Sequence, residues 1–193
     1  MKYYDKICIY IYNILWMYVL LKGDTILSFY IVYYITMYNI FFYETDIGTI
    51  GIREDGQYIT NIYFSKFNTE DNILETDLIR SGIMQINEYI QGKRKKFDLP
   101  LNLEGTEFQK KVWDELKNIP YGETRSYKDI AVAIGNEKAS RAIGMANNKN
   151  PIPILIPCHR VIGANGKLVG YRGGLDIKEK LLNIENADLN KGE

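Results

Sequence analysis

The sequence predicts an α+β protein. A small antiparallel sheet with one helix is expected in the N-terminal half, and a mostly helical, winged-helix-like domain with a helix-turn-helix in the C-terminal half. Turn signals separate β-rich runs between residues 37 and 67, and a helical period follows from about 71 to 90. Two short helix patterns joined by a glycine turn then occupy residues 126–147.

The expected domain boundaries follow these changes of pattern. A length of 193 residues suits one domain or two small ones. We divide the chain into an N-terminal extension (1–36), an α/β support domain (37–100), a C-terminal domain (101–187) and a short tail (188–193).

The first 36 residues differ in composition from the rest. Residues 8–21 carry no charge, and a second uncharged run, Ile26–Tyr43, has 18 residues, near the lower limit for a membrane span. The density of Tyr and Ile equally suits β-strands, and the first run lacks a signal-peptide cleavage site. We favour a third interpretation, in which Met37 is the natural start and residues 1–36 lie upstream of it. A membrane anchor is the less favoured alternative.

Turn and strand signals organise the support domain. Asp46–Gly48 and Glu54–Gln57 indicate turns, so the β-rich runs Thr49–Ile52 and Tyr58–Phe64 are expected to pair as a hairpin. A helix is expected from about Asp71 to Ile90. This half holds no cluster of reactive side chains, and we expect it only to support the other domain.

Capping residues mark the helices of the C-terminal domain. Thr106 is expected to cap a first helix. Ser126 is expected to cap a short second helix, with Asp129 completing a capping box and Gly135 ending the helix. The last helix is predicted over Ile177–Glu185, with three apolar residues inward: Leu181, Leu182 and Ile184.

Asn136 is expected to cap a further helix, roughly Glu137 to Asn147, which completes a helix-turn-helix. Its inward face is expected to hold Ala139, Ala142, Ile143 and Ala146. Its other face is expected to hold Ser140, Arg141, Gly144 and Asn147. That face is small except for Arg141, so the helix could approach DNA closely. A generic αα-hairpin fits the same composition equally well.

Charge is unevenly distributed along a chain whose formal net charge is +0. Residues 1–104 contain 10 Lys/Arg and 13 Asp/Glu, a balance of −3, whereas residues 105–185 contain 13 and 9, a balance of +4. Between residues 138 and 172 lie six basic residues and no acidic one. Such a field is expected of a phosphate-facing surface, although a solvated face with a chance bias gives the same count.

The segment 151–161 places Cys158 beside His159, the one histidine of the chain. Three prolines stiffen it, and the apolar run 154–156 is expected to be buried. A neighbouring imidazole can generate a reactive thiolate near neutral pH. A core cysteine is the alternative, because adjacent residues on a strand point to opposite faces. With one further cysteine, Cys8, we expect a reducing compartment, no disulfide and no metal.

Four segments, in this order along the chain, resemble the motifs of the O6-alkylguanine-DNA alkyltransferases, also called methylated-DNA–protein-cysteine methyltransferases. They are Gly122–Tyr127, Ala139–Gly144, Asn150–Val161 and Tyr171–Leu175. The similarity covers about residues 37–186 and is weaker in the first half. It implies that residues 101–187 form a DNA-binding and alkyl-transfer domain.

The resemblance implies a DNA repair enzyme that reverses damage directly. Cys158 would take the alkyl group from O6-alkylguanine in double-stranded DNA after base flipping, and would keep it irreversibly. Each molecule would therefore act once. O4-alkylthymine is a second candidate substrate. No cofactor is implied, and the sequence lacks the zinc ligands that animal-type relatives carry. We expect a cytoplasmic monomer.

The resemblance also implies roles in the chemistry. His159 would activate Cys158 through a water, and Glu185 would orient and charge-balance the imidazole. Asn150 would hold the local turn, and Tyr127 would donate its hydroxyl to the flipped guanine.

A second set of residues would bind DNA and the base. Arg141 would fill the space that the flipped base leaves, while Lys128 and the helix N-terminus at Asn136 would meet phosphates. Small side chains would let the helix lie in the minor groove: Ser140, Gly144 and Asn147. The base pocket would be lined by the carbonyl of Val161, by Tyr171 and by the backbone of Arg172.

Two rival functions fit parts of the pattern. A non-enzymatic DNA-binding module of winged-helix type would work without Cys158. A cysteine hydrolase would use Cys158 and His159 but would turn over repeatedly.

A variant that begins at Met37 is expected to fold and to repair DNA like the full chain, because the first strand is predicted to begin there. Circular dichroism and a repair assay on both proteins check this. An insoluble or inactive shortened protein would contradict the interpretation of residues 1–36.

Overall fold

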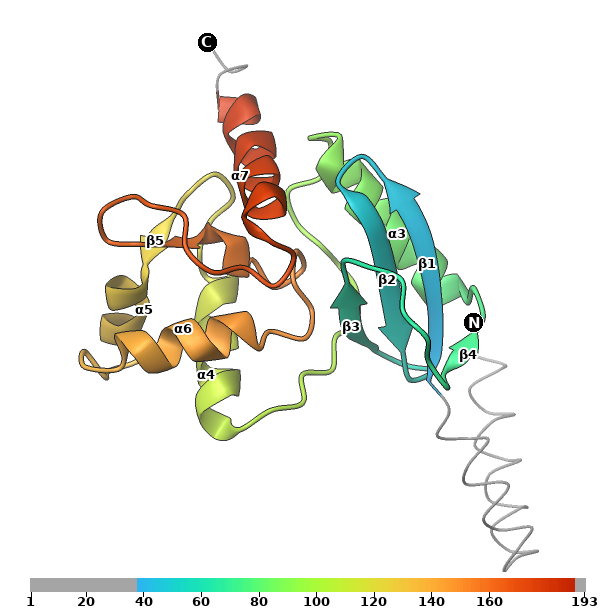
Figure 1. The fold of residues 1–193 in the computed structure, drawn as a ribbon, viewed down its shortest axis with the longest axis horizontal. Helices are drawn as coiled ribbons and strands as arrows, with labels where there is room; N and C mark the ends of the chain where they lie inside the picture. Colours follow the sequence, from blue (N-terminus) through green and yellow to red (C-terminus); the bar gives the residue numbers. More distant parts are fainter. Residues whose placement is uncertain (1–37, 190–193) are drawn as a thin grey trace, which may run out of the picture. The chain divides into compact units, whose positions relative to one another are not determined.

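The computed structural model describes residues 38–189. The interpretations given above for residues 1–36 concern residues outside that range. The N-terminal part is a four-stranded sheet in the order β3-β2-β1-β4, with one long helix on it (Figure 1). Its elements are β1 (Asn39–Thr45), β2 (Gly48–Glu54), β3 (Ile59–Tyr63), β4 (Asn72–Ile73) and α3 (Asp77–Ile90).

The antiparallel part of this sheet follows the predicted pattern. β1 pairs with β2 from Asn39↔Glu54 to Thr45↔Gly48, and β2 pairs with β3, which confirms the expected hairpin. Gly48 has φ 107°, a left-handed conformation that favours glycine in the tight turn after Thr45. The fold class expected from the sequence is therefore confirmed.

One strand and one helix boundary differ from the prediction. The helix expected from about Asp71 begins at Asp77, because Thr76 caps it by accepting a hydrogen bond from the backbone of Ile79. Residues 72–74 instead extend the sheet: Asn72 N–H donates to Tyr38 O, and Leu74 N–H donates to Ile40 O. This edge pairing is parallel to β1 and only two residues long, too short for a visible β pattern.

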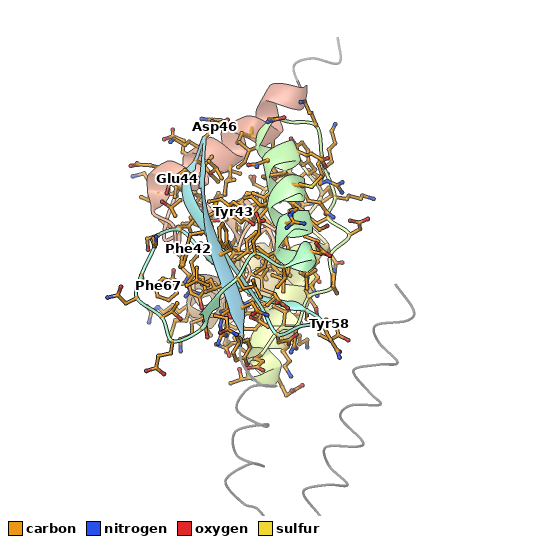
Figure 2. All side chains as sticks on the ribbon, turned by 90° about the vertical axis from the view of Figure 1, so that its right-hand side faces the viewer. Phe42, Tyr43, Glu44, Asp46, Tyr58 and Phe67 are labelled. Carbon is orange, nitrogen blue, oxygen red and sulfur yellow. The ribbon has the colours of Figure 1, made fainter. Side chains whose placement is uncertain are left out.

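Helix α3 lies close against the sheet. A Cβ atom on Gly82 would come within 3.2 Å of the side chains of Ile52 and Ile59, so glycine permits the close approach. The buried stripe of α3 ends at Tyr89, which is 0% exposed. Elsewhere in this domain Phe42 packs edge to face on Phe67 with ring centroids 5.6 Å apart (Figure 2).

The C-terminal part is mostly helical, as expected (Figure 1). Its helices are α4 (Glu107–Lys117), α5 (Tyr127–Ala133), α6 (Ser140–Asn148), the 3-10 helix η1 (Cys158–Arg160) and α7 (Leu175–Leu189). Two short strands, β5 (Arg125–Ser126) and β6 (Val161–Ile162), pair in parallel and join the start of α5 to the segment after η1.

The predicted cap at Thr106 and the predicted capping box at Ser126 are both present, and Thr106 forms a capping box as well. The hydroxyl of Thr106 accepts from the backbone of Gln109, whose side chain accepts from the backbone of Thr106. Ser126 and Asp129 form the same reciprocal pair at the start of α5. These bonds satisfy donors that helix starts otherwise leave unpaired.

Helix α6 differs from the prediction in its start and in its faces. It begins at Ser140 without a side-chain cap, because the exposed residues 136–138 form a turn in which Ala139 N–H donates to Asn136 O. The expected cap at Asn136 is therefore wrong. Ala142 is exposed rather than inward, whereas Asn147, expected on the outer face, is 3% exposed.

Helix α7 is longer than predicted. It runs from Leu175 to Leu189, so Glu185 lies within the helix and not at its end. Residues 188 and 189, expected in the tail, are helical. Leu181 is fully buried, while Leu182 and Ile184 are half-buried.

Along residues 38–189, no helix is long and apolar enough to cross a membrane. The cytoplasmic location and the domain boundaries stay predictions.

Candidate active site

The stiff segment 150–157, called the arm below, precedes η1 and positions Cys158. The side chain of Asn150, 1% exposed, ties the arm into a turn: Nδ2 donates to Ile156 O over 2.9 Å, and Oδ1 accepts from Ile152 N–H over 3.0 Å. Ile154 is buried with φ 75°, a left-handed conformation that costs a β-branched residue about 1–3 kcal/mol. The surrounding packing holds this strained backbone in place.

Cys158 is the first residue of η1 and is 2% exposed. Its backbone carbonyl accepts a hydrogen bond of 3.2 Å from Nδ2 of Asn147. Burial raises the pKa of the Cys158 thiol to about 11, against the opposing effects of the Asn150 amide and the Lys178 cation. Because burial disfavours the thiolate, a nearby base is needed to remove the thiol proton.

His159 is fully buried, and its Nε2 lies 2.9 Å from Oε1 of Glu185 and 3.1 Å from the hydroxyl oxygen of Tyr89. The Tyr89 hydroxyl donates its own hydrogen to Glu185 Oε1 over 2.6 Å. Both neighbours of Nε2 therefore present acceptor oxygens, and Nε2 carries the proton.

The other ring nitrogen, Nδ1, is the basic one in this tautomer. Among residues 38–189 it has no hydrogen-bond partner. Burial lowers the pKa of His159, and the hydrogen bond to Glu185 opposes that shift only in part. The imidazole therefore favours its neutral form, which can accept a proton at Nδ1.

Glu185 is the charged centre of the cluster. Arg160 donates to it from Nε over 3.1 Å and from Nη2 over 2.8 Å, and Gly122 N–H donates to Oε2 over 3.0 Å. Burial alone would raise the pKa of Glu185, but the bonds and charges of His159 and Arg160 outweigh it and lower the pKa to about 2. Since burial favours neutral His159, we attribute the effect mainly to Arg160.

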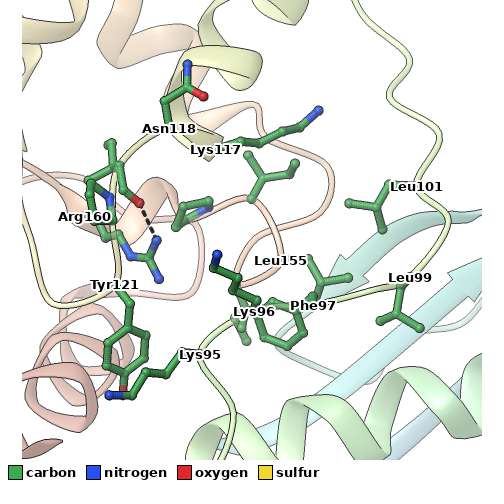
Figure 3. Close-up of a pocket in the computed structure, with 15 residues that line it drawn as sticks. Lys95, Lys96, Phe97, Leu99, Leu101, Lys117, Asn118, Tyr121, Leu155 and Arg160 are labelled. Carbon is green, nitrogen blue, oxygen red and sulfur yellow. Dashed lines mark hydrogen bonds between the residues drawn. The ribbon is translucent and has the colours of Figure 1, made fainter.

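Arg160 in turn is fixed by a 2.6 Å bond from Nη1 to the carbonyl of Ile119 (Figure 3). A cavity of about 610 Å³ lies beside it, lined by residues such as Lys96, Leu155 and Pro157. Arg160 and Pro157 line this cavity, but Cys158 does not.

Two tyrosines and a lysine also interact electrostatically with Cys158. The Tyr127 hydroxyl donates to Val169 O over 3.2 Å, and burial followed by the proximity of Cys158 raises its pKa. The same two causes raise the pKa of Tyr171. Lys178 donates to the carbonyls of Val161 and Val169 over 2.6 and 2.9 Å, and burial lowers its pKa to about 8.

Three buried side-chain atoms have no hydrogen-bond partner among the described residues: Asn147 Oδ1, His159 Nδ1 and Tyr171 Oη. All three belong to residues near Cys158: Asn147 bonds its carbonyl, His159 follows it, and Tyr171 interacts with it electrostatically. Unpaired buried polar atoms are costly, so their gathering here indicates a place where a polar ligand can bind.

The residues expected to contact DNA are mostly at the surface. Arg141, Lys128 and Asn136 are exposed, and Ser140 is half-buried. Asn147 was expected on the DNA-facing surface, and that expectation is wrong. It is buried, and its amide supports the Cys158 backbone.

Arg172 is also exposed, and only its backbone is expected to take part in binding the base. Its Nη1 donates to Asn150 O over 3.3 Å. Among the described residues no group of three or more His, Cys, Asp or Glu could hold a metal ion.

The sequence reasoning missed several of the residues that complete the cluster. Arg160 follows the Cys-His pair directly, and Lys178 interrupts the apolar stripe of α7. Tyr89 belongs to the apolar pattern of α3, in the half of the chain that is expected to support the other domain. The structure shows one contact through which that half reaches the site, because the Tyr89 hydroxyl bonds both His159 and Glu185.

Comparisons with known proteins identify the family of this chain. Residues 34–103 match the family model described as the ribonuclease-like domain of 6-O-methylguanine DNA methyltransferase, and residues 107–187 match the model of its DNA binding domain. These two matches cover most of the chain, which therefore belongs to the 6-O-methylguanine DNA methyltransferase family.

Two curated relatives illustrate the likeness. The methylated-DNA–protein-cysteine methyltransferase of Methanosarcina acetivorans is 51% identical over 150 residues, covering 75% of this chain and 96% of the relative. The constitutive enzyme of that name from Bacillus subtilis is 48% identical over 153 residues, covering 74% and 92%.

Solved structures show a similar fold. The Mycobacterium tuberculosis O6-methylguanine methyltransferase aligns with a TM-score of 0.72 at 41% identity, covering 78% of this chain and 94% of that one. The same organism's OGT in complex with DNA aligns with a TM-score of 0.72 at 42% identity, covering 77% and 93%.

Replacing Glu185 by Gln is expected to destabilise the protein at pH 7 by about 3–5 kcal/mol, because Arg160 is left as an uncompensated buried charge. The folded pKa of Glu185, about 2, is below its ordinary 4.5. The ionised group therefore stabilises the fold fully above pH 4.5, and that contribution is lost as the pH falls towards 2. The deficit of the variant should shrink over this range.

Urea unfolding at pH 7 and near pH 3 measures both effects. Glu179→Gln, an exposed change on the same helix, is the control and should alter little. A Glu185→Gln protein as stable as the wild type at pH 7 would contradict the electrostatic account.

Proposed function

We propose that this protein repairs DNA by direct damage reversal, transferring the alkyl group of O6-alkylguanine to its own Cys158 in a single, irreversible event. The observation that carries the proposal is a set of three buried residues, Cys158, His159 and Glu185, which we call the relay. Nε2 of His159 contacts Glu185, and Nδ1 has no partner among the described residues. The names of the relatives, methylated-DNA–protein-cysteine methyltransferase, agree with this chemistry.

The reaction exchanges one bond for another. The sulfur of Cys158 attacks the alkyl carbon, the S–C bond forms, and the bond from that carbon to O6 breaks. The thiol proton passes to Nδ1 of His159 through a bridging water, and a proton finally accompanies the departing guanine. Burial raises the pKa of Cys158, so the neutral imidazole is the base that makes this attack possible.

Glu185 supports the proton transfer. When Nδ1 accepts the proton, the imidazole becomes a cation, and the carboxylate 2.9 Å from Nε2 stabilises it. Arg160 helps to keep that carboxylate ionised, since the pKa of Glu185 is lowered to about 2. Asn150 fixes the arm, so that the sulfur meets the alkyl carbon in line.

The damaged base has to leave the stack, which costs a few kcal/mol. Arg141, exposed on α6, fills the vacated space from the minor groove. Ser140 and Gly144 keep this surface of the helix small, and Lys128 meets a phosphate.

The flipped base enters beside Tyr127 and Tyr171. The Tyr127 hydroxyl, now on Val169 O, turns to the base and stabilises negative charge as guanine leaves. The unpaired hydroxyl of Tyr171, the Val161 carbonyl and the Arg172 backbone line the pocket. Asn136 is exposed and could still meet a phosphate, but without the help of a helix N-terminus, because it caps no helix.

The product is a thioether that no group in the relay can reverse. One molecule therefore removes one lesion, and no cofactor and no second copy of the chain are required.

Chromatography of digested DNA tests the proposal. Protein mixed with excess O6-methylguanine duplex should restore one guanine per molecule and then stop. Cys8→Ser should behave like the wild type and Cys158→Ser should restore none. Repair by Cys158→Ser, or repeated turnover as expected of a hydrolase, would refute it.

Arg141→Ala is expected to slow repair of duplex DNA roughly tenfold or more while leaving reaction with free O6-methylguanine nearly unchanged, because only the duplex needs a flipped base. Single-turnover rates on both substrates measure this. Equal losses on the two would remove the proposed role of Arg141.

A further inference from the structure

Helix α3 carries a side chain of the N-terminal domain into the relay. Tyr89 is 0% exposed, and its hydroxyl contacts both charged partners of the proton transfer: it donates to Glu185 Oε1 over 2.6 Å and lies 3.1 Å from Nε2 of His159. These two bonds span 96 and 70 positions of the sequence. The relay is thus assembled from both domains.

The ring of Tyr89 is held independently of its hydroxyl. It packs against Phe97 with centroids 5.4 Å apart, against Tyr121 at 6.1 Å, and edge-on to His159 at 6.3 Å. A phenylalanine would keep all three contacts. The hydroxyl is therefore separable from the packing, and its two bonds are the part that can be tested alone.

The direction of these bonds is fixed. Burial, followed by the negative charge of Glu185, raises the pKa of Tyr89, so its hydroxyl keeps its proton and donates it to the carboxylate. The oxygen lone pairs then face Nε2–H of His159. Tyr89 shares one carboxylate oxygen of Glu185 with the imidazole, and its contact with Nε2 restrains the His159 ring.

We propose that Tyr89 is a positioning residue of the alkyl-transfer site, through which the N-terminal domain holds the Glu185 carboxylate and the His159 ring in register for proton transfer from Cys158. The inference rests on the proposed function for its kinetic consequence but not for its geometry. It assigns the N-terminal domain a part in the reaction beyond support.

Removing the hydroxyl has a consequence that loss of packing would not have. Glu185 would lose one of its donors, and its negative charge would act more strongly on the imidazole, so the pKa of His159 should rise. The other ionisable groups facing Tyr89 and the ring stay unchanged: Arg160 on η1, Tyr121 in the loop before β5, Tyr171 in the loop before α7, and Lys178 on α7.

Tyr89→Phe is the test, and Tyr43→Phe is the matched control. Tyr43 donates its hydroxyl to Glu75 over 2.8 Å in the same domain, so the control also removes a tyrosine–glutamate bond, but outside the relay. His159 is the one histidine of the chain, so ¹⁵N NMR of the labelled imidazole reports on it without ambiguity.

We expect Tyr89→Phe to raise the pKa of His159 measurably and to slow single-turnover methyl transfer roughly tenfold at neutral pH. The acid limb of its rate profile should move to higher pH, with DNA affinity unchanged. Tyr43→Phe should leave the ring titration and the rate as in the wild type. Glu185 keeps Arg160 and Gly122, so the variant should remain folded, which circular dichroism checks.

An unchanged titration of His159 in Tyr89→Phe, or a transfer rate equal to or faster than that of the wild type, would overturn the proposal. A fall in thermal stability without either change would make the role structural only, and would overturn it as well. If the wild type itself transfers no methyl group, the proposed function fails, while the NMR titration still decides whether Tyr89 controls the ring.

Discussion

A carboxylate that stays charged inside the protein is the constraint on which the site depends. Glu185 is 0% exposed, and an isolated buried carboxylate would be neutralised by protonation. Here Arg160, Gly122, Tyr89 and His159 all contact its two oxygens. These partners come from α3, η1 and the loop after α4, so residues of both domains stabilise the charge.

The same constraint explains the state of the nucleophile. Burial disfavours charge on Cys158 and on His159, and the one stable negative charge of the relay lies beyond the imidazole. In the proposed reaction, proton transfer from sulfur to Nδ1 would create an ion pair that the Glu185 carboxylate stabilises. The strained Ile154 and the turn held by Asn150 would keep the sulfur in place during this step.

Much of the site could be predicted because it is local in the sequence. Cys158, His159 and the proline-stiffened arm lie within one short segment, and the capping boxes of Thr106 and Ser126 depend on residues three apart. The sequence did not predict contacts between distant segments. Tyr89 follows the apolar period of α3, and only the tertiary structure brings its hydroxyl to Glu185.

The errors have similar causes. Asn136 is a good capping residue, but the chain makes a further turn before α6, which begins at Ser140. The packing of α6 buries Asn147 and leaves Ala142 exposed. β4 consists of two residues whose pairing with β1 is decided by neighbours rather than by their own pattern. Residue roles in DNA binding remain predictions, since they depend on a partner and not on the fold alone.

Peptide mapping by mass spectrometry tests the central claim most directly. After incubation with O6-methylguanine DNA, the account predicts one added methyl group on the peptide that contains Cys158, in every active molecule, and none on the peptide with Cys8. Unmodified Cys158 alongside repaired DNA, or a methyl group on another residue, would contradict the account.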